Sequence, residues 1–229
     1  MKREVLAEFL GSLLLAAAVI GSGVMAERLA AGNAAVALLG NTLATVTALG
    51  VLIAMLAPIS GAHFNPAVTL VALAQRKIAA SQAGAYVLAQ VAGCCAGAML
   101  AHLMFELPLV GASTHSRAGI AQWLSEVVAT AGLILVIFTS PTLGAAARRV
   151  PAWIAAAYWF TASTSFANPA ITVARSLTDT FSGIRPQDVP GFVIAQVVGA
   201  GVGMLLLRAL SERNKPLPSA PAIVTEEGT

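Results

Sequence analysis

Apolar runs of about the length needed to cross a lipid bilayer recur along this chain of 229 residues. A helix of roughly 18 or more apolar residues spans the hydrocarbon core. Hydrophobic residues make up 58% of the sequence and charged residues only 10%, against about 25% charged residues in a soluble domain. Because so few charges cannot cover a water-facing surface, we expect an all-α protein that crosses the membrane several times.

Six spans are expected, together with one shorter apolar segment in each half of the chain. The short segments, residues 66–74 and 169–177, have only two to three helical turns and cannot cross the membrane. Pro58 and Gly61 are expected to end the second span, and Arg148 and Arg149 to lie in a loop. The expected channel domain covers residues 1–210, followed by a flexible tail at 211–229. The six spans are residues 5–25, 34–56, 83–103, 120–140, 152–162 and 191–210.

Both short segments begin with the tripeptide Asn-Pro-Ala. Asparagine is a good N-cap, and proline at the first helical position loses no hydrogen bond that the helix needs. One copy would be an ordinary helix start, but two copies among apolar segments indicate a shared function. The two motifs consist of Asn65, Pro66 and Ala67, and of Asn168, Pro169 and Ala170.

An internal repeat extends beyond these motifs, with halves at about residues 4–104 and 120–210. Glu8 in the first span corresponds to Glu126 in the fourth, and Gln90 corresponds to Gln196. Three spans per half is an odd number, so the halves are expected to enter the membrane in opposite orientations. Short apolar segments at matching places in such inverted repeats indicate the solute site.

The positions of the basic residues support this topology. With a cytoplasmic N-terminus, nine Lys and Arg residues fall on the inner side and four on the outer side, as the positive-inside rule requires. We therefore expect a multi-pass protein of the cell's inner (plasma) membrane with both termini in the cytoplasm. The inner set is Lys2, Arg3, Arg76, Lys77, Arg148, Arg149, Arg208, Arg213 and Lys215, and the outer set is Arg28, Arg117, Arg175 and Arg185.

The two short helices are expected to meet start to start near the membrane midplane. Each helix start carries the equivalent of about half a positive charge, so the meeting point repels cations. Asn65 and Asn168 can turn side-chain N–H groups toward the lumen and donate to the oxygen of a neutral solute. This arrangement predicts a pore for small uncharged polar molecules.

Three titratable residues near the motifs have alternative interpretations. Glu8 and Glu126 lie within spans, where a carboxylate is costly. They either brace the loops by accepting backbone N–H bonds, which we favour because they occupy matching repeat positions, or act in a proton relay. His63 could line the pore, sense pH or brace its loop.

No cofactor, metal or nucleic acid is indicated. Cys94 and Cys95 are adjacent and therefore predict no disulfide framework. The spans contain no His/Asp/Glu cluster at metal spacing and no nucleophile beside a base, so an intramembrane enzyme ranks last. An inverted-repeat secondary transporter remains an alternative of a different class, and it would need ionisable residues at the midplane.

The twin motifs, the Glu-bearing first and fourth spans and the inverted halves resemble the aquaporin (major intrinsic protein) family. The resemblance implies six membrane-spanning helices, two re-entrant half-helices, one pore per subunit and a homotetramer. It also implies an outer constriction, which by counting from the motifs falls on Thr45, on or near Ala156, and on Ser165 and Ile171.

This constriction departs from the family pattern, which has arginine at the position of Ile171 and often an aromatic residue at that of Thr45. We therefore expect a wider, less polar opening. Arg175 is either a displaced filter charge or, as we favour, a vestibule residue paired with Asp179. The same departures are similar to those of bacterial aquaglyceroporins associated with arsenic resistance, which implies neutral trivalent arsenic species as solutes. Glycerol, urea and water remain compatible.

Overall fold

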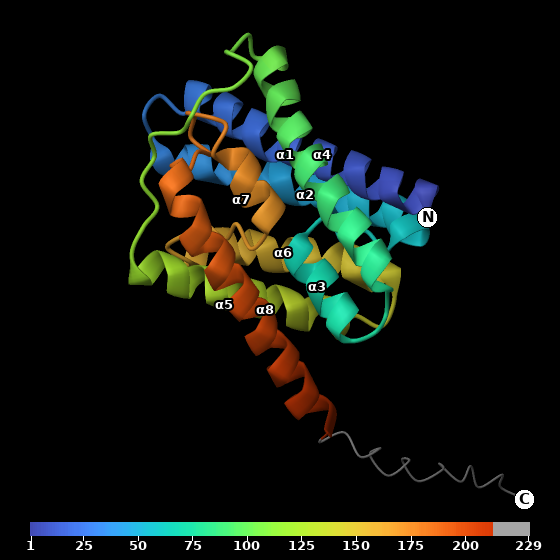
Figure 1. Ribbon diagram of the computed structural model, residues 1–229. Coiled ribbons are helices and arrows are strands. Elements are labelled where there is room, and N and C mark those ends of the chain that lie inside the picture. The colour runs from blue at the N-terminus through green and yellow to red at the C-terminus, as the bar shows by residue number, and fades with distance from the viewer. Residues whose placement is uncertain (213–229) are drawn as a thin grey trace, which may run out of the picture.

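The computed structural model describes residues 1–212, which form a bundle of helices (Figure 1). The part of the tail from residue 213 onward lies outside the described residues. The order of elements is the same in both halves: two long helices, one short helix and another long helix. The helices are α1 (Lys2–Leu29), α2 (Ala34–Ser60), α3 (Pro66–Ala74), α4 (Ala80–Met104), α5 (Ile120–Phe138), α6 (Leu143–Phe160), α7 (Pro169–Arg175), the 3-10 turn η1 (Pro186–Asp188) and α8 (Val189–Glu212).

Five of the described helices are long and apolar enough to cross a membrane: α1, α2, α4, α5 and α8. The sixth long helix, α6, has 18 residues, and Arg148 and Arg149 lie within it rather than in the expected loop. It begins earlier than expected because the Thr142 side chain caps it, accepting a hydrogen bond from Ala145 N at 3.1 Å.

The second span also continues beyond its expected end. Pro58 lies inside α2, which ends only at Ser60. A proline this close to the C-terminal end removes a single helical hydrogen bond and leaves no long helical segment after it. Gly61 ends the helix instead, because its φ of 87° is left-handed and suits glycine.

Close packing of α1 against α4, and of α5 against α8, uses matching glycines. A Cβ atom on Gly97 of α4 would overlap the carbonyl oxygen of Leu13 on α1. A Cβ atom on Gly203 of α8 would lie 2.7 Å from the carbonyl oxygen of Ala131 on α5. Small residues at these crossings let the helix backbones approach each other.

Gly97→Ala is therefore expected to destabilise the protein by about 1–3 kcal/mol, because the added methyl meets backbone that cannot move out of its way. Gly84→Ala is the matched control on the same helix, since nothing lies within 4 Å of a Cβ placed there. Thermal denaturation in detergent measures both variants. Equal melting temperatures for Gly97→Ala and Gly84→Ala would contradict the close approach of α1 and α4 at Gly97.

The short helices α3 and α7 lie in the middle of the bundle, with the long helices around them (Figure 1). The long connection between α4 and α5, residues 105–119, runs along one side of the molecule (Figure 1). It is tied to the segment after α7 by backbone bonds from Gly111 N to Leu177 O and from Ser113 N to Ser176 O. The two short helices and their preceding loops thus form the centre on which a site can be built.

Candidate pore and its constriction

A cavity of about 470 Å³ runs beside the starts of α3 and α7. One wall consists of the loops that precede these helices, and the other of apolar side chains from α1, α2, α5 and α6. The apolar residues recur every four positions, which is the spacing of one helix face. They include Leu15, Val19, Leu49, Ile53, Leu133, Ile137, Val150 and Ile154.

Each motif asparagine caps its short helix. Asn65 Oδ1 accepts a hydrogen bond from Ala67 N at 2.9 Å, and Asn168 Oδ1 accepts from Ala170 N at 3.0 Å. Proline follows each cap at the first helical position. The Asn-Pro-Ala sequence therefore fixes where both helices begin.

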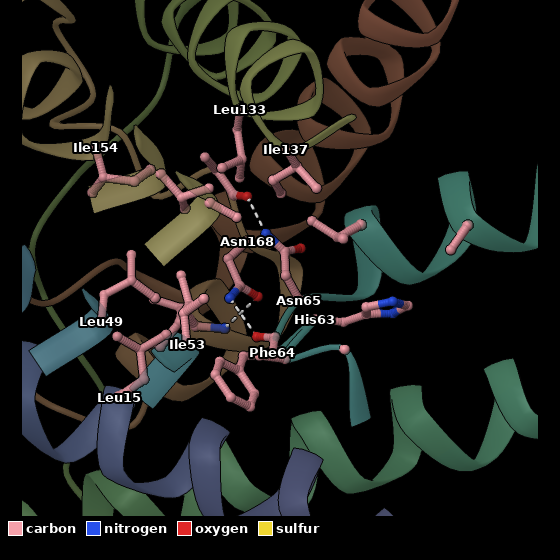
Figure 2. Close-up of a pocket in the computed structure, with 18 of the residues that line it drawn as sticks. Leu15, Leu49, Ile53, His63, Phe64, Asn65, Leu133, Ile137, Ile154 and Asn168 are labelled. Carbon is pink, nitrogen blue, oxygen red and sulfur yellow. Dashed lines mark hydrogen bonds between the residues drawn. The ribbon is translucent and has the colours of Figure 1, made fainter. Parts of the chain in front are cut away.

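The two asparagines also tie the loops to each other (Figure 2). Asn65 Nδ2 donates to Ala167 O at 2.7 Å, and Asn168 Nδ2 donates to Phe64 O at 2.8 Å. An amide nitrogen carries two hydrogens, so this exchange uses one N–H of each asparagine. One N–H per asparagine is left for the lumen, and both side chains line the cavity.

The loops before the short helices have matching left-handed residues. Positive φ angles occur at Ala62 (49°) and Phe64 (48°) in the first loop, and at Ser165 (51°) and Ala167 (48°) in the second. Each such residue costs roughly 1–2 kcal/mol. Interactions elsewhere must therefore hold these loops in place.

Glu8 holds the first loop. Its carboxylate is fully buried and accepts hydrogen bonds from His63 N at 3.0 Å, Phe64 N at 2.7 Å and Ser60 Oγ at 2.6 Å. Gln90 Nε2 donates a further bond at 2.7 Å. This geometry is that of a brace for the loop.

Glu126 holds the second loop in the same way. Its buried carboxylate accepts from Phe166 N at 2.9 Å and Ala167 N at 2.8 Å. Gln196 Nε2 donates to it at 2.6 Å and also to Thr172 Oγ1 at 2.8 Å. The repeated Glu and Gln residues thus occupy equivalent places in the two halves.

His63 lines the cavity and is also fixed by its neighbours. Its Nδ1 lies 3.0 Å from Thr69 Oγ1, and its ring meets that of Tyr86 edge-on at 5.5 Å between centroids. Figure 2 shows it to one side of the two asparagines. Its position combines two of the roles expected from the sequence, lining the cavity and bracing the loop.

Three of the four expected constriction residues line the cavity: Thr45, Ser165 and Ile171. Ala156 does not; it is exposed on the other side of α6. Residues two apart on a helix point about 200° apart, and α6 turns Ile154 and Tyr158 toward the cavity instead. The assignment of Ala156 is therefore wrong.

The expected pairing of Arg175 with Asp179 is also wrong. Arg175 is 3% exposed and lines the cavity, and its Nε donates to Ser182 O. Asp179 accepts from Thr114 N at 2.8 Å and Thr114 Oγ1 at 2.9 Å, which lowers the pKa of its carboxyl. A helical i,i+4 pair cannot form because α7 ends at Arg175.

Sequence reasoning missed the aromatic residues of the cavity lining, among them Tyr158 and Phe166. The Phe166 ring lies under the Arg175 guanidinium, whose carbon is 3.4 Å from the ring centroid. The four-residue spacing from Val150 to Ile154 could have indicated Tyr158. Aromatic rings and a charge therefore line this cavity at positions other than those of Thr45 and Ile171.

Comparison with known proteins agrees with this architecture. The family model described as "Major intrinsic protein" matches residues 1–160. Aquaglyceroporin AqpS of Rhizobium meliloti (strain 1021) is 52% identical over 219 residues, covering 95% of this chain and 94% of the relative. Aquaporin-2 of Rattus norvegicus is 30% identical over 219 residues, covering 91% of this chain and 78% of the relative.

A solved structure shares the fold. The aquaglyceroporin from Plasmodium falciparum superposes with a TM-score of 0.71 at 21% identity, over 93% of this chain and 96% of that chain. The all-helical bundle with two short helices at its centre is accordingly an aquaporin-like membrane fold. The family model covers more than half of the chain and one relative is 52% identical over nearly its whole length, so this chain belongs to the major intrinsic protein family of membrane channels.

Proposed function

We propose that the protein is a passive channel for small uncharged solutes of the size of glycerol. The observation that carries this proposal is the meeting of two helix starts beside one cavity, tied by the bonds from Asn65 to Ala167 O and from Asn168 to Phe64 O. The partial positive charges at two helix N-termini create a positive field that is fixed in the backbone. A neutral solute meets N–H donors there, while a cation meets a barrier.

The two walls of the cavity suit a solute with hydroxyl groups on a carbon skeleton. The apolar wall accepts the skeleton, and the loop wall offers polar groups. Thr45 Oγ1 and Ser165 Oγ are buried without a hydrogen-bond partner among the described residues, and both side chains line the cavity. Unpaired buried hydroxyls of this kind can bond to a passing solute.

The solutes of this proposal are glycerol and neutral trivalent arsenic acids. Arsenite in its uncharged form carries three hydroxyl groups and resembles a small polyol in its hydrogen bonding. Water selectivity is the second candidate, and Tyr158 and Arg175 favour it, because a ring and a charge at the cavity narrow the passage for polyols.

Stopped-flow light scattering on proteoliposomes tests the proposal. The wild type is expected to admit water, glycerol and neutral arsenite. Ile171→Arg is expected to lower glycerol and arsenite flux at least about tenfold while water flux persists, because a long charged side chain replaces a buried apolar one beside Thr45 and Ser165. Ile171→Val is the matched control and should keep all three fluxes. Rapid water flux without glycerol influx in the wild type would favour the water-selective alternative.

A secondary transporter fits these contacts less well. Proton coupling needs a carboxylate that is free to change its charge during transport. Glu8 and Glu126 are each fully buried, and each holds its loop through two backbone N–H bonds. Loss of either charge would release a pore loop, so we assign both carboxylates a bracing role.

In the cell, the proposal places this channel in the plasma membrane as a homotetramer with one pore per subunit and both termini in the cytoplasm. The charge distribution supports the orientation, and the resemblance to aquaporins supports the tetramer. Lipid and the neighbouring subunits would cover the apolar side chains that α1 and α2 expose, such as Leu10, Leu14, Leu43 and Val51.

A further inference from the structure

The pore-facing sides of α3 and α7 differ in charge. In each short helix, the residues three and seven positions after the capping asparagine lie on the same side of the helix as the asparagine. The seventh position holds alanine in α3 and arginine in α7. All six residues line the cavity: Asn65, Val68, Ala72, Asn168, Ile171 and Arg175.

The Arg175 guanidinium is not neutralised by a carboxylate. Within residues 1–212, its Nε bond to Ser182 O is its one side-chain hydrogen bond, and no acidic oxygen lies within 4.0 Å of it. The Phe166 ring lies against the guanidinium, whose carbon is 3.4 Å from the ring centroid. A buried cation that lines the cavity and has no carboxylate partner acts directly on whatever passes through it.

Arg117 has a different role although it contacts the same ring. Its guanidinium carbon lies 5.0 Å from the Phe166 centroid, but two of its nitrogens donate to carbonyl oxygens. Its Nε donates to Gly183 O at 2.7 Å and its Nη1 to Ser163 O at 3.4 Å. Arg117 does not line the cavity, so it braces the loops while Arg175 meets the solute.

Lys77 is the other side chain with a fixed positive charge in the cavity lining, and it lies beyond the end of α3. It is exposed, and its ammonium lies 4.4 Å from the centroid of the Phe138 ring. Water screens an exposed charge far more than a buried one. The buried charge of the lining is therefore confined to the α7 half.

We propose that this channel separates its charge filter from its size filter along α7. Arg175 is the specificity-determining residue that excludes cations, including hydronium, and it donates to solute oxygens. Ile171, four residues and about 6 Å closer to the asparagines, limits solute size without a charge. The inference rests on the proposed function, since it assigns a selectivity role within the same pore.

Paired ion and solute measurements on proteoliposomes test this assignment. A valinomycin-clamped potassium gradient drives protons inward, a trapped pH dye reports them, and light scattering reports glycerol. Arg175→Gln removes the charge but keeps a donor, and Arg175→Lys keeps the charge. Arg28→Met is the control, because Arg28 also bonds a carbonyl (Phe105 O, 3.1 Å) and stacks on a ring (5.2 Å) but does not line the cavity.

We expect Arg175→Gln to raise proton influx at least about tenfold, since one unit charge at short range is worth more than 1.4 kcal/mol in a poorly solvated passage. Glycerol flux should change less than about threefold, and Arg175→Lys and Arg28→Met should stay as proton-tight as the wild type. Equal tightness of Arg175→Gln and Arg175→Lys would overturn the assignment. Absence of glycerol flux in the wild type would overturn the proposed solute instead, while the proton measurement would still decide the role of Arg175.

Discussion

Glu126→Ala is expected to abolish the folded channel. The change leaves Phe166 N, Ala167 N and Gln196 Nε2 buried without their acceptor. Each unsatisfied buried donor costs about 1–3 kcal/mol, or roughly 3–9 kcal/mol for the three. This sum approaches the 5–15 kcal/mol that typically holds a domain together. The second pore loop, with its left-handed residues Ser165 and Ala167, would lose its brace.

Size-exclusion chromatography in detergent and thermal denaturation measure this effect. Glu106→Ala is the matched control, because Glu106 is an exposed loop residue whose side chain makes no hydrogen bond within residues 1–212. Glu126→Gln should lie between the two, since its amide oxygen can still accept one of the backbone bonds. A monodisperse Glu126→Ala protein with the melting point and glycerol flux of the wild type would refute the bracing role.

The double change Asn65→Ala and Asn168→Ala is the second large expected effect. It removes both helix caps, each worth about 0.5–2 kcal/mol. It also leaves the carbonyl oxygens of Phe64 and Ala167 without the bonds that join the loops. We expect the glycerol flux per folded channel to fall at least about tenfold, because a misplacement of about 1 Å at a binding centre costs up to a hundredfold.

Asn33→Ala separates capping from pore function. The Asn33 side chain caps α2 by accepting hydrogen bonds from Ala35 N at 3.1 Å and Val36 N at 3.2 Å. The Asn33→Ala variant therefore loses the same kind of helix cap, but at an exposed site. This variant should lose some stability and keep its glycerol flux. Equal flux in Asn33→Ala and in the double variant, measured per folded channel, would show that the central asparagines act only as caps.

The sequence predicted the centre of the molecule well because its features are local or repeated. Asn-Pro-Ala specifies a helix start by capping chemistry alone, and both copies are observed at helix starts. The matching positions of Glu8 and Glu126 indicated equivalent surroundings, and each meets the loop of its own half. The family assignment followed from these same residues.

The errors arose where we counted positions along the sequence, as if on one helix, across residues that are not helical. Ala156 was reached by counting back from Asn168 across residues 161–168, which are not helical, so the count did not preserve the helix face. Tyr158, on the face of Val150 and Ile154, was missed for this reason. The pairing of Arg175 with Asp179 assumed a helix that ends at Arg175. The burial of Arg175 depends on residues 105–119 and 176–185 packing together, which no local pattern encodes.

The most direct test of passive permeation by neutral solutes is the glycerol flux of wild-type proteoliposomes as a function of glycerol concentration and ion gradients. A static pore should give a flux that rises linearly with the glycerol gradient, with a low temperature dependence, and that is unchanged when proton and sodium gradients are collapsed. Saturation at low concentration, together with loss of flux when either ion gradient is removed, would contradict the channel and favour an ion-coupled transporter.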